Sequence, residues 1–138
     1  MPTRTKILIV DEDTDVLRLL QVKLSRAGYT VSRARDGCEA QEVATSEQPH
    51  LVLMELLLPD TDGVELLGQL RTATPTPPLT LILSAKTEDA MIAAALTAGA
   101  VDYITKPFSP QGVLERIRIA LIRASLLTVT DKVQDHYA

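Results

Sequence analysis

Short apolar runs and longer amphipathic segments alternate along the chain. The runs Ile7–Val10, Leu51–Met54 and Leu79–Leu83 are continuous and bounded by polar residues or proline, which is typical of strands buried on both faces of a parallel sheet. Tyr29–Ala34 and Val101–Thr105 are weaker candidates of the same kind. The pattern therefore predicts five strands, each followed by a segment with helical spacing.

The segment after the first strand predicts a helix that ends at Gly28, because glycine is favoured directly after a helix C-terminus. This helix has an apolar stripe with one polar member, Lys23, and the stripe comprises Val16, Leu19, Leu20, Lys23, Leu24 and Ala27. The other predicted helices are Gly37–Glu47, Val64–Thr72, Glu88–Ala98 and Ser109–Leu127. Five βα units with short connections predict an α/β fold, with a parallel sheet and helices on both faces.

The last predicted helix has more than one apolar stripe. The stripe expected to be buried comprises Leu114, Ile117, Leu121 and Ala124. Ile119, Ile122 and Leu126 lie off it, and are either a partner surface or the scattered exposed aliphatic residues common on proteins. The polar residues 128–138 predict a C-terminal tail or the start of a linker, so the predicted domain spans residues 1–127.

Composition excludes several classes of protein. With 138 residues, 46% of them apolar, the chain can bury one core and is not a disordered or fibrous protein. A net charge of −4, no basic cluster and 3% aromatic residues argue against direct binding of nucleic acid by this domain. No run approaches the ~18 apolar residues of a membrane span, and no apolar signal segment is seen, so we expect no membrane contact and a cytoplasmic location.

Polar residues follow four of the predicted strands. Asp11 and Glu12 follow the first, Glu55 the third, Ser84 the fourth and Lys106 the fifth. Because ligands of open α/β sheets bind beyond the carboxyl ends of the strands, we expect these side chains to meet at one edge. The set suits phosphoryl transfer: acids hold Mg²⁺, the lysine neutralises charge, the hydroxyl bonds a phosphoryl oxygen and one carboxylate is the acceptor.

Ordinary structural roles are the alternative for each of these residues. Asp13 or Thr14 is expected to cap the first helix, and Lys106 alone could be a strand-end cation. Glu55 is the hardest to explain in this way, because an ionised carboxylate in an apolar segment costs several kcal/mol unless it is paired or bound to a metal. The joint placement at consecutive strand ends favours a functional site.

Four motifs together resemble one family. The segments "ILIVDED", "PHLVLMELLLPDTDGVELL", "LILSA" and "AGAVDYITKPF" resemble the receiver domain of two-component response regulators over about residues 5–127. The resemblance implies a flavodoxin-like (βα)5 doubly wound parallel sheet of strand order 2-1-3-4-5. It also implies phosphorelay signalling, with a sensor histidine kinase or another signalling protein as partner, and no enzyme activity beyond the domain's own phosphoryl transfer.

The resemblance assigns roles by position in the motifs. Asp11 and Glu12 match the family's acidic pair, Ser84 its switch hydroxyl and Tyr103 its switch aromatic residue. Lys106 matches its lysine, and Pro107 matches the proline that follows an often cis peptide bond. In the family's switch the hydroxyl moves inward and the aromatic residue rotates after it. This alters the face formed by the fourth helix, the fifth strand and the fifth helix, which is a candidate for a homodimer contact.

Two positions depart from the family pattern. Glu55 stands where the resemblance implies a phospho-accepting aspartate, and Glu12 where an aspartate usually binds the metal. Misplacement by about 1 Å can lower a rate ~100-fold, so phosphorylation of Glu55 is not expected. The metal set would be Asp11, Glu12 and Glu55, and its two longer arms are expected to weaken Mg²⁺ binding or abolish it.

Three interpretations of Glu55 are open at this point. It imitates a phosphorylated aspartate by reaching Ser84 and Lys106, or it belongs to a natural interaction module that needs no phosphorylation, or it was engineered as a mimic. A phosphatase or phosphotransferase of the haloacid dehalogenase type is the rival class. Asp15 breaks the D-x-D-x-[TV] motif of that class, no acidic pair follows Lys106, and the chain leaves no room for a cap domain.

Overall fold

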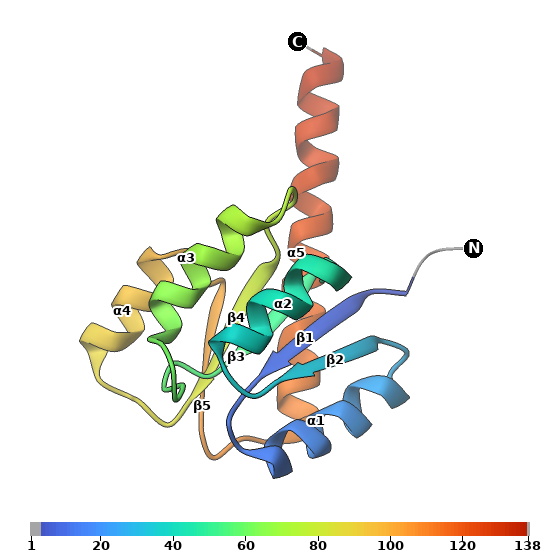
Figure 1. Cartoon of the computed structure of the whole chain (residues 1–138). Helices are drawn as coiled ribbons and strands as arrows, with labels where there is room; N and C mark the ends of the chain where they lie inside the picture. Colours follow the sequence, from blue (N-terminus) through green and yellow to red (C-terminus); the bar gives the residue numbers. More distant parts are fainter. Residues whose placement is uncertain (1–3, 138) are drawn as a thin grey trace.

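The computed structural model describes residues 4–137, and the side chains of residues 4–125, as strands and helices that alternate along the chain (Figure 1). The strands are β1 (Lys6–Val10), β2 (Thr30–Ala34), β3 (Leu51–Met54), β4 (Leu79–Ser84) and β5 (Asp102–Thr105). The helices are α1 (Thr14–Arg26), α2 (Gly37–Glu47), α3 (Gly63–Ala73), α4 (Asp89–Thr97) and α5 (Pro110–Tyr137). All five predicted strands and all five predicted helices are present, with ends that differ by one or two residues except at the C-terminus of α5, which the sequence predicts at Leu127 and which lies at Tyr137.

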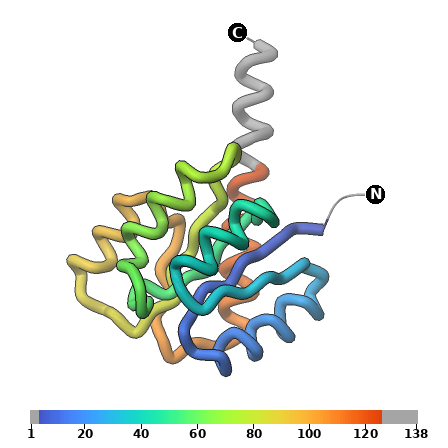
Figure 2. The backbone as a smooth tube through the Cα atoms, in the orientation of Figure 1, coloured from blue at the N-terminus to red at the C-terminus, as the bar shows by residue number. Residues whose placement is uncertain are grey.

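All strand pairs are parallel, and the sheet order is β2-β1-β3-β4-β5. Figure 2 follows the chain from β1 inside the sheet to β2 at one edge, then back through β3 to β5 at the other edge. The predicted flavodoxin-like order is confirmed. Because the order reverses after β2, helices cover both faces, and the carboxyl ends of β1 and β3 lie side by side.

Two apolar cores lie on opposite faces of the sheet. Ile7 and Ile9 of β1 pack with α1 and α5, whereas Leu8 and Val10 of the same strand pack with α2, α3 and α4. Both sets are 0–1% exposed. A strand whose two faces are both buried has no solvent side, which explains why these runs are continuously apolar in the sequence.

The buried face of α1 differs from the predicted stripe. Leu17, Leu20 and Leu24 are buried, but Leu19, which was part of the predicted stripe, is 49% exposed. Leu20 and Leu24 are three and seven positions after Leu17, so these three side chains lie on one face of the helix. The sheet contacts this face, and Leu19 lies outside it. The predicted helix end is confirmed, since Gly28 follows the C-cap with a φ of 102°.

Helix α5 carries both of the predicted kinds of apolar residue. Leu114 and Ile117 are buried, and Ile119 and Ile122 are 46% and 58% exposed. The helix continues to Tyr137, so a domain end at residue 127 stays a prediction, and Leu126 lies outside the described side chains. Among the described residues, no helix combines the length and apolar character needed to cross a membrane.

Thr80 offers a test of the core. Its side chain is 1% exposed on β4, and its Oγ1 is the one buried side-chain polar atom of the described residues that has no hydrogen-bond partner. We expect Thr80→Val to raise the free energy of unfolding by about 1 kcal/mol, because valine keeps the shape and removes an unpaired hydroxyl.

Urea denaturation of Thr80→Val beside a matched control measures this effect. Thr74→Val is the control, since the Thr74 hydroxyl is also buried but donates to the carbonyls of Leu70 and Thr76 at 3.1 and 3.2 Å. This second change is expected to destabilise the fold. Destabilisation by both substitutions would show that the Thr80 hydroxyl has a favourable contact after all.

Candidate functional site

Four parallel strands end at the edge of the sheet that the sequence predicts as a site. Asp11 follows β1, Glu55 follows β3, Ser84 ends β4 and Lys106 follows β5. Asp11 and Glu55 are only 4% and 7% exposed, and Ser84 is fully buried. The sheet topology alone brings these residues together, because they are far apart in the sequence.

Lys106 lies between the two buried carboxylates. Its Nζ is 2.7 Å from Oδ2 of Asp11 and 3.1 Å from Oε1 of Glu55. Burial acts to lower the pKa of Lys106, but the hydrogen bonds and charges of Asp11 and Glu55 outweigh it and raise that pKa above its ordinary value. The ammonium group therefore stays charged and compensates for the burial of the carboxylates.

The remaining oxygens of both carboxylates accept main-chain hydrogen bonds. Oε2 of Glu55 accepts from the amides of Leu56 and Leu57 at 2.6 and 3.2 Å. Oδ1 of Asp11 accepts from the amide of Asp13 at 2.9 Å. Each of the four carboxylate oxygens thus has a donor within the chain, and the Glu55 carboxylate turns back over its own loop.

The side chains of Glu12 and Asp13, the next residues of the acidic segment, are not among the hydrogen-bond or ion-pair partners of Asp11, Glu55 or Lys106 in the described part of the chain. Asp13 is the N-cap of α1, where its Oδ1 accepts from the amides of Asp15 and Val16, as the sequence predicts. Glu12 is exposed to solvent. Asp11 is buried and Glu12 is exposed because adjacent residues leave the end of a strand in different directions, and a joint role of the two acids stays a prediction.

Asp11, Glu12 and Glu55 are the residues that would hold Mg²⁺, and binding of the ion there stays a prediction. Mg²⁺ prefers several oxygen ligands in octahedral geometry. Within the described part of the chain, no three residues among His, Cys, Asp and Glu come close enough to hold a metal. In addition, the oxygens of Asp11 and Glu55 that face each other are already bound to Lys106.

Ser84 and Tyr103 meet at the main chain of Lys86. The Ser84 hydroxyl accepts from the Lys86 amide at 3.2 Å, and the Tyr103 hydroxyl donates to the Lys86 carbonyl at 2.6 Å. Tyr103 is 9% exposed, and burial is the main cause that raises its pKa. Both side chains thereby hold the loop that leads from β4 to α4.

One of the three interpretations of Glu55 includes a contact with Ser84, and the hydrogen bonds of the described residues do not include it. The Ser84 hydroxyl is engaged with Lys86, and Glu55 is engaged with Lys106 and its own loop. Of the two contacts in the first of the three interpretations, only the one with Lys106 is among these hydrogen bonds, and the main-chain amides of Leu56 and Leu57 hold the other Glu55 oxygen. The peptide bond between Lys106 and Pro107 is cis.

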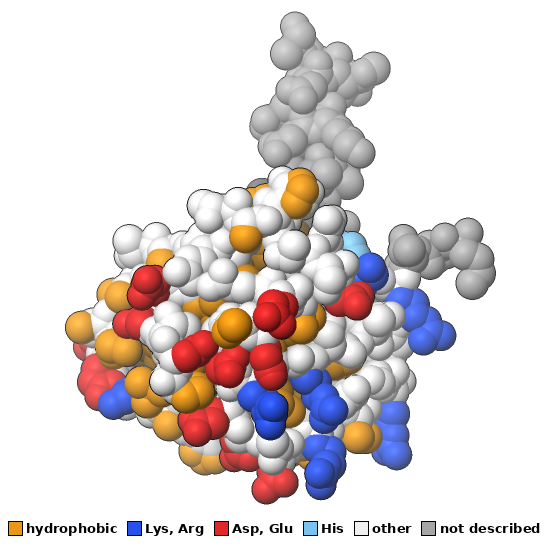
Figure 3. Space-filling view, in the orientation of Figure 1, with side chains coloured by type: hydrophobic (Ala, Val, Ile, Leu, Met, Phe, Trp, Pro, Cys, Tyr) orange, Lys and Arg blue, Asp and Glu red, His pale blue; other side chains and the backbone are white. Residues whose placement is uncertain are grey.

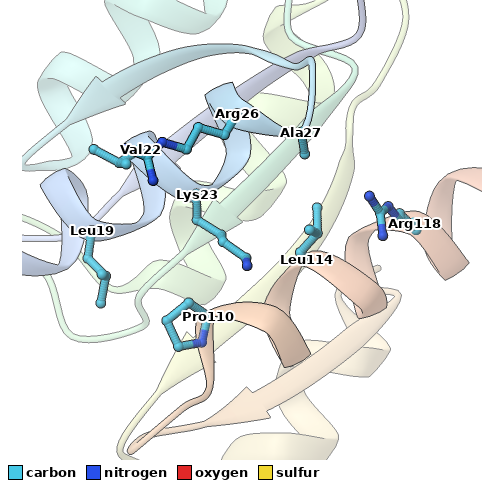
Figure 4. Close-up of a pocket in the computed structure, with 8 residues that line it drawn as sticks. All are labelled: Leu19, Val22, Lys23, Arg26, Ala27, Pro110, Leu114 and Arg118. Atoms are coloured by element: carbon cyan, nitrogen blue, oxygen red, sulfur yellow. The ribbon is translucent and has the colours of Figure 1, made fainter.

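Other hollows of the surface lie away from this cluster. A groove of about 370 Å³ separates α1 from α5, with Leu19 and Val22 on one wall and Leu114 on the other (Figure 4). Lys23 and Arg118 border it. Figure 3 shows Lys and Arg side chains gathered over β2 and α1, and Asp and Glu side chains gathered over α2 and α3. No carboxylate of the described residues lines the groove.

Comparisons with known proteins agree with this geometry. A family model described as the response regulator receiver domain matches residues 7–118. The alkaline phosphatase synthesis transcriptional regulatory protein PhoP of Bacillus subtilis is 39% identical over 130 residues, which are 94% of this chain and 54% of that protein. The chain thus spans about half the length of the curated relatives it matches.

Solved structures give the same result. A CheY-like receiver domain protein from Methanospirillum hungatei is 31% identical with a TM-score of 0.83, over 88% of this chain and 96% of that chain. A two-component response regulator from Clostridium difficile is 30% identical with a TM-score of 0.82, over 88% and 98% of the two chains. These matches give no support to the haloacid dehalogenase alternative.

Proposed function

The chain belongs to the response regulator receiver domain family, and on that premise we propose that it is a two-component signalling module whose state does not depend on phosphorylation at Glu55. We further propose that Glu55 stands at the position of the family's phospho-accepting aspartate. Asp11, Ser84, Tyr103 and Lys106 would then be the remaining members of the same site, and Glu12 its second acid.

The observation that carries the proposal is the closed contact of Lys106 with Asp11 and Glu55. Both oxygens of Glu55 are engaged, one by the ammonium group of Lys106 and one by two main-chain amides. A carboxylate that is to attack a phosphoryl donor needs a free oxygen directed toward it. In this arrangement the lysine supplies within the chain the positive charge that balances the acids.

Tyr103 supports a fixed state of the module. In the family's switch, the aromatic residue is expected to turn inward after the hydroxyl has moved. In this chain Tyr103 is already buried and its hydroxyl is bonded to the Lys86 carbonyl, with Glu55 unmodified. Because Glu55 does not contact Ser84, the structure favours a module that needs no phosphorylation over a complete imitation of a phosphoryl group.

We propose that the face made by α4, β5 and α5 is the contact surface, with a second copy of the chain as the partner. Leu96 of α4, Val101 directly before β5, and Ile119 and Ile122 of α5 are 45–58% exposed. Such a group of exposed aliphatic side chains is typical of a protein contact. A sensor histidine kinase or another signalling protein is the proposed upstream partner, and the proposal includes no turnover of a substrate.

Charged substitutions on this face test the contact. Val101→Lys combined with Ile122→Lys is expected to weaken self-association at least tenfold, because two ammonium groups would have to be desolvated. Sedimentation equilibrium measures the dissociation constant, with and without acetyl phosphate. The matched control is Leu19→Lys with Val22→Lys, since these residues are 49% and 45% exposed on α1. Equal weakening by the control, or association only after phosphodonor treatment, would refute the proposal.

A further inference from the structure

The loop between β3 and α3 carries the two amides that bind Glu55, and its two ends are held together. Leu57 and Asp62 form an isolated antiparallel bridge, and the Gly63 amide donates to the Leu56 carbonyl at 2.8 Å. A Cβ on Gly63 would lie 2.6 Å from the Leu56 Cα, so the backbone at the two ends of the loop is in close contact. The loop is a narrow, closed turn.

The tip of this loop is anchored to the N-terminus of α2. Oδ1 of Asp60 accepts from the Gly37 amide at 2.8 Å, and Oδ2 accepts from the Cys38 amide at 2.9 Å. These amides belong to the first turn of a helix, where they have no partner within the helix and where a negative charge is favoured. The same two hydrogen bonds lower the pKa of Asp60, with the Gly37 amide as the larger cause.

Gly37 allows the loop to approach the helix this closely. A Cβ at this position would lie 2.5 Å from Cγ2 of Thr61 and 3.2 Å from Oδ1 of Asp60. The next amide of α2, that of Glu39, is bonded at 2.8 Å by Asp36, the helix's own N-cap. Two carboxylates therefore accept from the amides at the N-terminus of α2, that of Asp36 from the helix cap and that of Asp60 from the loop.

We propose that Asp60 is a positioning residue for the Glu55 carboxylate. It holds the loop tip on α2, and the closed loop in turn holds the Leu56 and Leu57 amides against Oε2 of Glu55. That Glu55 belongs to a signalling site rests on the proposed function, whereas the positioning of its carboxylate by Asp60 does not. It links α2, which contributes no side chain to the site, to the direction in which Glu55 points.

Amide hydrogen exchange by NMR tests the positioning. In Asp60→Ala, the Leu56 and Leu57 amides are expected to exchange about tenfold faster relative to the Leu8 and Leu53 amides of the core. Asp60→Asn, which keeps one acceptor oxygen, is expected to lie between this variant and the unaltered chain. Gly37→Ala leaves Asp60 in place but crowds the loop, and it is expected to produce the same faster exchange.

Asp36→Ala is the matched control. It removes the local cap of the same helix without touching the loop, so it is expected to reduce overall stability while leaving the relative exchange of Leu56 and Leu57 unchanged. Unchanged exchange in both Asp60→Ala and Gly37→Ala, or equal acceleration in Asp36→Ala, would overturn the inference. These outcomes are independent of whether the chain accepts a phosphoryl group, so they do not test the proposed function.

Discussion

Lys106→Met is expected to lower the free energy of unfolding by about 3 kcal/mol, and Glu55→Gln by only about 1 kcal/mol. The lysine is the shared partner of two carboxylates whose side chains are 5% and 9% exposed. Without it, Asp11 and Glu55 would face each other as buried like charges. Without the charge of Glu55, Lys106 keeps its shorter contact with Asp11.

Urea denaturation at neutral pH measures both losses. Lys86→Met is the matched control, because Lys86 is paired with Glu88 at 4.0 Å while the two side chains are 40% and 60% exposed. An ion pair of this kind contributes ~0–1 kcal/mol, so this substitution is expected to change the stability little. Equal losses for Lys106→Met and Glu55→Gln would contradict the picture of one lysine shared by two buried acids.

Glu55→Asp is expected to convert the chain into one that takes up a phosphoryl group. The shorter side chain withdraws the carboxylate by about one bond, so it can no longer be held by both Lys106 and the loop amides as Glu55 is. A change of about 1 Å in the place of a reacting atom is worth ~100-fold in rate. Intact-mass spectrometry after incubation with acetyl phosphate and Mg²⁺ measures the modified fraction.

Glu55→Asn is the control for this gain of reactivity. Asparagine has the size of aspartate but no carboxylate to attack the donor, so no adduct is expected. An adduct on the asparagine variant would place the modification at another residue. No adduct on the aspartate variant would show that Glu55 is not the feature that prevents phosphorylation, and that the rest of the pocket has changed as well.

The fold could be predicted from the sequence because burial on both faces leaves a clear pattern. Leu51–Met54 is 0–1% exposed along its whole length, and such a strand has to read as a continuous apolar run. The buried face of α1 was harder to predict. Leu17 and Leu19 are both apolar but lie about 200° apart around the helix, on nearly opposite sides, and only the packing against the sheet decides which of them is buried.

The members of the site could be predicted from the sequence only where they contribute a polar side chain. Asp11, Glu55 and Lys106 follow strands, and the topology of a parallel sheet brings strand ends together. The amides of Leu56 and Leu57 and the peptide of Lys86 have no signature in the sequence, because any residue supplies the same main-chain groups. The two amides hold the Glu55 carboxylate and the Lys86 amide donates to the Ser84 hydroxyl, so the separation of Glu55 from Ser84 could not be foreseen.

The most direct test of a state that needs no phosphorylation uses the unaltered chain. Its intact mass is measured after incubation with acetyl phosphate and Mg²⁺, beside Glu55→Asp as the positive control, and its self-association is measured on the same samples. We predict an unmodified mass and unchanged association for the unaltered chain while the variant gains one phosphoryl group. A phosphoryl adduct mapped to Glu55 of the unaltered chain would contradict this conclusion.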